Sequence, residues 1–210
     1  IVTQNPTWAD TKAAYRFYDN MNVTFDKVSG QHWQQTRQTQ PGRYLLICDT
    51  TEIDHTLHKA TKGLGILGNG KGRGMQLHSC LMYDSTAKQI VGTAGAVIHY
   101  RKLVPEGETD MQRLNRLRES HVWGTLANQV GTAPEGSQWI HVWDRGGDNF
   151  ESMCHVVLSK NDFIVRASRL NRKVITSDGE STELKKAINE GKVLGTYDVE
   201  VRTRKKDTAR

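Results

Sequence analysis

The apolar residues of the chain change their spacing along the sequence, and this change predicts a mixture of strands and helices. Short apolar runs bounded by glycine, proline or polar residues predict strands, which we place at 44–49, 75–84, 90–100, 137–144 and 162–168. Apolar residues that recur every three to five positions predict helices, which we place at 8–20, 24–35, 110–130, 149–160 and 181–192. A further β segment is expected from residue 193 onwards, where charged residues alternate.

The order of these elements indicates the fold class. Between residues 44 and 168 three strands come first, and a helix, a strand, a helix and a strand follow. Such an order predicts an α/β fold with a mixed sheet flanked by helices. The gap between the second and third strands is of hairpin length, so a β-hairpin is expected there.

Two of the predicted strands end on an aspartate. Asp49 follows the apolar run from Tyr44 to Cys48, and Asp144 follows Trp143. Functional crevices of open α/β sheets lie at strand ends, so the two aspartates are expected to meet if their strands are neighbours. Adjacent carboxylates repel one another without a cation. Mg²⁺ or Mn²⁺ prefers such oxygen ligands, and a pair of these ions supports phosphoryl transfer.

A structural role is the alternative for both aspartates. Aspartate at a strand end commonly caps a turn or a helix, and Asp144 is placed to cap the helix predicted at 149–160. The sequence pattern leaves both interpretations open.

The segment 63–74 contains six glycines and resembles a nucleotide-binding loop only in part. Gly65 to Lys71 has the spacing G-x-x-x-x-G-K, but Gly72 occupies the position where Ser or Thr must reach Mg²⁺. A strand follows, so no helix N-terminus faces a phosphate. We therefore exclude an ATP site, and Lys71 and Arg73 either contact nucleic-acid phosphates or lie in a mobile hairpin.

Composition and charge narrow the class of protein. A hydrophobic content of 36% with 25% charged residues fits a globular protein, and no apolar run reaches the length of about 20 residues that crosses a bilayer. Of the net charge of +6, most lies between Lys160 and Arg210, which contain 13 basic and 8 acidic residues. This excess fits a polyanionic partner, with a solvated tail as the alternative. Cys48, Cys80 and Cys154 have no zinc-site spacing and indicate a reduced, intracellular protein.

Five segments occur in an order that points to one family. They are AYRFYDN (14–20), DTTEIDHTLHKATKGLGILGNGKGRGMQLHSCL (49–81), RESHVW (118–123), WDRGGDNF (143–150) and DFIVRAS (162–168). The second contains Asp49, Thr50 and His78, and the fourth contains Asp144, Arg145 and Asp148. Together they resemble the DDE transposases of the bacterial cut-and-paste insertion-sequence group that includes transposon-five transposase. The resemblance covers about residues 14–210.

This resemblance implies a fold, a metal and partners. It implies a ribonuclease H-like core at 41–168, a remnant of an N-terminal DNA-binding region at 1–40, and the beginning of an inserted β-rich, basic subdomain at 169–210. The implied cofactor is Mg²⁺, with Mn²⁺ as a substitute. The implied partners are double-stranded DNA, as transposon ends and target, and a second copy in a synaptic homodimer. The implied location is the bacterial cytoplasm, in association with the nucleoid, and no membrane is involved.

The resemblance also implies roles for individual residues. Asp49 and Asp144 match the catalytic, metal-binding aspartates, and Asp148, Thr50 and His78 are given supporting roles. DNA contacts are expected from Lys71, Arg73, Arg145, Arg166, Arg202, Arg204, Lys205 and Lys206. Other roles remain open: Arg145 could pair with Asp148, Arg166 could be an ordinary surface residue, the cluster from Arg202 to Lys206 could be a solvated hairpin, and His78 could be a near-core histidine.

The chain departs from the family at the third metal ligand. The family carries a glutamate in a Tyr-Arg-Glu-Lys block, whereas Tyr197 is followed here by Asp198, Val199 and Glu200. We therefore expect a fragment of the catalytic core that lacks its last ligand. The expected activity is metal-dependent cleavage and strand transfer by a 3′-hydroxyl through a hairpin intermediate. The alternative is a non-catalytic DNA-binding remnant, and a host ribonuclease H-like nuclease is disfavoured by the basic extension after Ser168.

Overall fold

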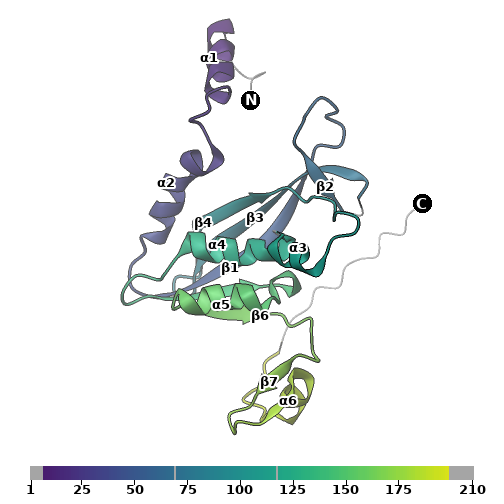
Figure 1. Ribbon diagram of the computed structural model, residues 1–210. Coiled ribbons are helices and arrows are strands. Elements are labelled where there is room, and N and C mark those ends of the chain that lie inside the picture. The colour runs from purple at the N-terminus through teal and green to yellow at the C-terminus, as the bar shows by residue number, and fades with distance from the viewer. Residues whose placement is uncertain (1–6, 69, 117, 199–210) are drawn as a thin grey trace, which may run out of the picture. The chain divides into compact units, whose positions relative to one another are not determined.

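The computed structural model describes residues 7–68, 70–116 and 118–198. The chain divides into two compact units, residues 1–168 and residues 169–210. The first unit contains a mixed β-sheet flanked by helices (Figure 1). Within the described residues, no helix is both long enough and apolar enough to cross a membrane.

The elements of the first unit follow one another in this order. Two helices come first, α1 (Trp8–Tyr18) and α2 (Phe25–Arg37). The sheet consists of β1 (Arg43–Asp54), β2 (Gly65–Leu67), β3 (Gly72–Asp84), β4 (Gln89–His99), β5 (Gln138–Trp143) and β6 (Asp162–Val165). Its connections contain α3 (Asp110–Asn115), the 3₁₀ turn η2 (Glu119–His121), α4 (Val122–Val130), the 3₁₀ turn η3 (Arg145–Gly147) and α5 (Phe150–Leu158). The second unit contains β7 (Lys173–Ile175), β8 (Ser181–Glu183) and α6 (Leu184–Glu190).

Strand β1 is central in the sheet of the first unit. It pairs antiparallel with β3 on one side and parallel with β5 on the other, and β6 extends the sheet in parallel beyond β5. Strand β3 also pairs with β4 and, near its own start, with β2. The pairing of β1 with β5 runs from Arg43 opposite Gln138 to Ile47 opposite Val142. Beyond Ile47, β1 continues against β3 alone as far as Asp54.

One face of this sheet is covered by α4 and α5 (Figure 1). The buried residues of α4 include Trp123, Leu126, Ala127 and Val130, a spacing of three and four that forms one apolar stripe. This stripe packs with alternate residues of the strands, among them Leu46, into one hydrophobic core. Burial of a large aliphatic or aromatic side chain contributes roughly 1.5–3 kcal/mol to folding. The core therefore specifies which residues of each strand face the helices.

The opposite face of the sheet is less covered. Ile47 lies opposite Val142 on β5, and Val142 lies opposite Ile164 on β6, so the three side chains form a row across the sheet. Ile47 is 39% exposed and Ile164 is 59% exposed. The two faces therefore differ, with a helix-covered core on one and an exposed apolar row on the other.

Helix α2 packs on the edge strand β4. It buries Trp33 and Thr36, and a Cβ atom at Gly92 would lie 2.6 Å from the Thr36 hydroxyl oxygen. The helix can approach the strand this closely because residue 92 has no side chain. The guanidinium of Arg37 also donates to the backbone oxygen of Gln129 at the end of α4, over 2.6 Å.

The prediction of a single helix at 110–130 is wrong. Helix α3 ends at Asn115, Arg116 is extended with ψ of 129°, and α4 begins only at Val122. Met111 is 68% exposed, so the apolar spacing of the first half does not reflect packing on the sheet. A partly buried ion pair between Arg116 and Glu108, at 2.6 Å, accompanies the break. The predicted end of the helix at Gly131, where φ is 82°, is confirmed.

Several other predicted boundaries also differ from the structure. The strand predicted at 44–49 continues to Asp54 because it pairs with β3 as far as Gly74. The strand predicted at 75–84 begins at Gly72 because its first residues pair with β2. The first three residues of the helix predicted at 181–192 form β8. Of the β segment predicted from 193 onwards, residues 193–198 form no strand, and the remainder lies outside the described residues.

The close approach of β1 and β3 makes Gly74 sensitive to substitution. A Cβ atom at this position would lie 2.1 Å from the backbone oxygen of Ile53. We expect Gly74→Ala to lower the free energy of unfolding by about 1–3 kcal/mol, as overpacking does elsewhere, measured by urea denaturation. Gly30→Ala is the matched control, because a Cβ there meets nothing within 4 Å and alanine favours the helix. A Gly74→Ala protein as stable as the wild type would contradict the close packing described.

Candidate functional site

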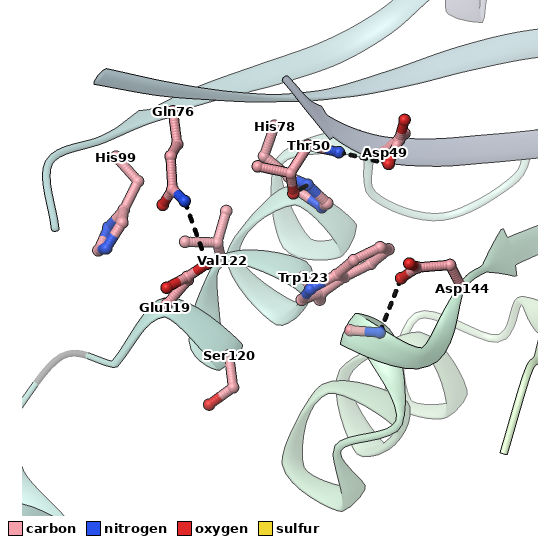
Figure 2. Close-up of a pocket in the computed structure, with 11 residues that line it drawn as sticks. Asp49, Thr50, Gln76, His78, His99, Glu119, Ser120, Val122, Trp123 and Asp144 are labelled. Atoms are coloured by element: carbon pink, nitrogen blue, oxygen red, sulfur yellow. Dashed lines mark hydrogen bonds between the residues drawn. The ribbon is translucent and has the colours of Figure 1, made fainter. Parts of the chain in front are cut away.

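The pairing of β1 with β5 brings Asp49 and Asp144 to one edge of the sheet. The register joins residues 95 positions apart, from Arg43 with Gln138 to Ile47 with Val142. The same offset, continued by two residues, places Asp49 beside Asp144. The backbone at Asp144 is still extended, with φ of −78° and ψ of −167°, and Figure 2 shows its side chain directed towards Trp123. Both aspartates are exposed, and both line an open pocket of about 480 Å³ (Figure 2).

Each of the two carboxylates is oriented by a local hydrogen bond. Asp49 Oδ1 accepts from the backbone N–H of Thr50 at 2.8 Å, and Asp144 Oδ1 accepts from that of Gly146 at 2.7 Å. Asp144 therefore caps the turn η3. The alternative that it caps helix α5 is wrong, because Asn149 occupies that position and accepts from the N–H of Glu151 at 2.9 Å. Capping and a role in the pocket are compatible, since Asp144 Oδ2 has no part in the cap.

Asp49 does not end its strand, contrary to the prediction. It lies at the point where β5 leaves β1, while β1 and β3 continue together for five more residues. Asp49 is paired with Ser79, and Thr50 with His78. The carboxylate is thus held on a rigid strand and not on a loop, and the open edge beside it results from the end of β5.

His78 is a buried residue that lines the same pocket as the two aspartates. It is 1% exposed, its Nδ1 is hydrogen-bonded to the Thr50 hydroxyl at 2.8 Å, and its ring centroid lies 4.3 Å from that of Trp123. Burial lowers the pKa of His78 to about 4, although the charges of Asp49 and Asp144 act in the opposite direction. One imidazole therefore experiences both carboxylates, which agrees with their proximity. His78 is both a core residue and part of the pocket wall.

The pocket contains a third carboxylate, Glu119, which the sequence pattern did not indicate. Glu119, from η2, forms a bidentate pair with Arg101, whose Nε and Nη2 lie 2.8 and 2.9 Å from its oxygens. Gln76 Nε2 also donates to Glu119 at 3.1 Å. The hydrogen bonds from Arg101 lower the pKa of Glu119. Figure 2 shows Glu119, Gln76 and His99 at one side of the pocket and the two aspartates at the other.

The segment RESHVW was the available signal for Glu119. Its glutamate directly precedes an apolar helix, but the motif alone did not indicate that the side chain lies in the same pocket as Asp49. Trp123, from the same segment, is buried in the core and also lines the pocket.

Three other residues with predicted roles lie next to this edge of the sheet. Asp148 is 8% exposed and accepts from the backbone N–H and the hydroxyl of Ser168 at 2.7 and 2.9 Å, which fastens the turn after β5 to the segment after β6. Arg166 is exposed, and its N–H donates to the oxygen of Trp143 at 3.1 Å. Arg145 is exposed, and within the described part of the chain it forms no ion pair with Asp148.

The remaining basic residues are not part of the pocket. Lys71 and Arg73 belong to the hairpin between β2 and β3, and neither lines the pocket. The guanidinium of Arg73 donates to the backbone oxygen of Thr61 at 2.9 Å, so this side chain is held within its own loop region. Arg202, Arg204, Lys205 and Lys206 lie outside the described residues.

The carboxylate oxygens of the pocket meet some, but not all, of the requirements of a site for a hard divalent cation. Asp49 and Asp144 offer carboxylate oxygens, which Mg²⁺ and Mn²⁺ prefer, and Mg²⁺ is commonly held by one or two carboxylates together with water and substrate phosphate. In the described ranges, no group of three His, Cys, Asp or Glu side chains is arranged to hold a metal ion. The pocket therefore supplies two protein ligands, with Glu119 occupied by Arg101.

The lowered pKa of His78 makes stability depend on pH. An exposed histidine in the unfolded chain titrates near 6.5, whereas the pKa of His78 in the folded chain is about 4. Between these values the unfolded state binds more protons, so the stabilisation is fully present above pH 6.5 and is lost as the pH falls towards 4. The loss amounts to at most about 3 kcal/mol.

Urea denaturation at pH 7.5 and pH 4.5 measures this loss. We expect the difference between the two pH values to be smaller in His78→Asn than in the wild type. His32→Asn, at an exposed position of α2, is the control and should retain the wild-type difference. An equal difference in all three proteins would contradict the burial of a neutral imidazole.

Comparison with known proteins does not identify the chain. Neither protein-family models nor curated proteins gave a match. Its function must therefore be inferred from the fold and from the geometry of the pocket that contains Asp49 and Asp144.

Proposed function

We propose that the chain is the catalytic-core segment of a DDE-type DNA transposase. The observation that carries this proposal is the juxtaposition of Asp49 and Asp144 by the parallel pairing of β1 with β5. The sheet order supports a ribonuclease H-like core, because β1 has antiparallel strands on one side and parallel strands on the other. The five sequence segments that resemble the transposase group support it further. In this proposal residues 169–210 begin an inserted, basic subdomain.

The residues of the pocket have separate roles in the proposed reaction. Asp49 and Asp144 hold the metal, and each is kept in place by its own backbone hydrogen bond. A Mg²⁺ or Mn²⁺ ion held by these two carboxylates would supply activation of a water and stabilisation of the leaving oxygen of the phosphodiester. His78 stays neutral at pH 7 and so does not replace the cation as a counter-charge to the aspartates. The exposed Arg145 and Arg166 contact DNA phosphates at the same edge.

The proposed substrate is double-stranded DNA at transposon ends. Water first hydrolyses one phosphodiester and frees a 3′-hydroxyl, which attacks the opposite strand, forms a hairpin and releases the flanking DNA. A second water then opens the hairpin, and the regenerated 3′-hydroxyl attacks a phosphodiester of target DNA and displaces its 3′-oxygen. Two copies of the chain act together on two DNA ends, in the cytoplasm of a bacterium and close to its nucleoid. Affinity for DNA rests on basic side chains and falls as salt concentration rises.

One observation favours a second candidate, a non-catalytic DNA-binding remnant. Over the described residues, the pocket offers two free carboxylates, and the third, Glu119, is paired with Arg101. A complete set of three metal ligands is therefore not assembled. In this alternative the chain binds DNA without cutting it.

Cleavage of plasmid and hairpin-ended DNA in Mn²⁺ separates the two candidates. We expect the wild type to cleave in Mn²⁺ but not in EDTA. Asp49→Asn and Asp144→Asn should each reduce cleavage by about 10²-fold or more, because each removes charge that holds the metal. Asp178→Asn changes an exposed aspartate in the second unit and should leave the rate unchanged.

The other outcomes have distinct meanings. Salt-dependent DNA binding without cleavage by the wild type would support the remnant and overturn the enzyme. Cleavage that persists in both aspartate variants would place the active site elsewhere. A wild-type chain that neither binds nor cleaves DNA would overturn both candidates.

A further inference from the structure

A second pocket shares a wall with the one that contains Asp49 and Asp144. Its volume is about 760 Å³, and it lies between the segment 97–104 and the start of α4. Four residues line both pockets: His99, Glu119, Ser120 and Val122. We call this second site the basic pocket. A chain-like ligand that occupied one pocket would pass directly into the other.

The charge of the basic pocket is opposite to that of its neighbour. Among the described residues that line it, four are lysine or arginine and one, Glu119, is acidic. Two of the cations are already paired, Arg101 with Glu119 at 2.8 Å and Arg116 with Glu108 at 2.6 Å. The other two cations that line the basic pocket are Lys102 and Arg118.

Lys102 and Arg118 are available to an anion. Lys102 is exposed and forms no ion pair with the part of the chain that the structure describes. The guanidinium of Arg118 lies 3.9 Å from the carboxylate of Glu151, which His121 contacts more closely, at 3.0 Å. Such a long, partly exposed pair contributes little. An anionic group in the basic pocket would therefore meet one cation without an ion pair among the described residues, Lys102, and one, Arg118, whose carboxylate partner is 3.9 Å away.

The basic pocket also has an apolar surface. Val97, Tyr100, Val104 and Val122 line it, and Tyr100 is 42% exposed and Val104 is 62% exposed. Exposed apolar and aromatic side chains beside uncompensated cations suit a ligand that carries both phosphate and a planar ring. Single-stranded nucleic acid has this chemistry, because its bases are free to stack.

We propose that the basic pocket binds an unpaired segment of the nucleic-acid strand whose neighbouring phosphate lies at Asp49 and Asp144. This inference rests on the proposed function. A volume of about 760 Å³ lies within the range of pockets that enclose a small organic molecule, roughly 300–1,000 Å³. It can take individual nucleotides, whereas a duplex has to stay outside. Phosphates of the segment contact Lys102 and Arg118, and a base packs on Tyr100.

The wall between the two pockets separates the opposite charges. Glu119 is held by Arg101 and Gln76, and Arg101 Nη1 also donates to the backbone oxygen of Gly68 at 3.1 Å. Arg101 therefore joins the wall to the turn between β2 and β3. The arrangement keeps Glu119 neutralised at the boundary, so that a strand crossing from the acidic pocket to the basic pocket does not meet an unpaired carboxylate there.

Fluorescence anisotropy without divalent metal tests the proposal separately from cleavage. The probes are a blunt duplex, the same duplex with a five-nucleotide thymidine overhang, and the duplex with an abasic overhang of equal length. We expect the wild type to bind the thymidine overhang about tenfold more tightly than the blunt duplex, with the abasic overhang in between. Lys102→Gln with Arg118→Gln should abolish the preference for either overhang. Tyr100→Ala should abolish only the difference between thymidine and abasic probes.

Control variants show whether an effect on binding is specific to the basic pocket. Lys88→Gln with Lys160→Gln removes two exposed cations that line neither pocket and should leave the overhang preference intact. Lys102→Gln alone, at an exposed position, replaces the double variant if that protein does not fold. Equal binding of all three probes by the wild type, or equal weakening of all probes by the double variant, would overturn the proposal. An overhang preference in a chain that never cleaves DNA would overturn the proposed enzyme and retain the basic pocket.

Discussion

Five residues of β1, from Arg43 to Ile47, pair in parallel with Gln138 to Val142 of β5, and the candidate site depends on this ladder. It brings together two segments that are 95 residues apart and aligns the residues that follow them. A slip of one residue would turn the side chains of β5 to the other face of the sheet. Trp139 and Trp143 would then leave the core, where both are buried. Burial of these side chains in the hydrophobic core thus fixes the register of β1 against β5, and this register positions Asp49 and Asp144.

The aromatic core also determines the turn that follows Asp144. A Cβ at Gly147 would lie 2.7 Å from Cβ of Trp143, and one at Gly146 would lie 3.0 Å from both Asp144 Oδ1 and Trp123 Cζ2. The tight turn that Asp144 caps therefore requires two residues without side chains. Trp123 in addition covers the buried His78. The carboxylate at the pocket edge is thus positioned by the same tryptophans that stabilise the fold.

Electrostatics divides the surface beside this edge into two parts. Asp49 and Asp144 line the same pocket, and the hydrogen bonds given for their carboxylates are local ones to backbone N–H groups, whereas Glu119 has a bidentate arginine. Uncompensated carboxylates at close range are costly without a cation, which is the physical basis for expecting a metal there. Lys102 and Arg118 lie on the other side of Glu119. In the proposed function, these cations would hold a negatively charged strand while one of its phosphates lies at Asp49 and Asp144.

The sequence by itself determined the α/β class and drew attention to Asp49 and Asp144, because hydrophobic period and strand-end chemistry are local properties of the chain. It did not predict the continuation of β1 to Asp54 or the break between α3 and α4, since both depend on partners far along the chain. Only the tertiary structure decided that Gln76, Arg101 and Glu119 meet. These residues come from three separate segments, and Gln76 is 43 positions from Glu119. Side-chain contacts between distant segments follow from how the elements pack, and a one-dimensional pattern does not contain that information.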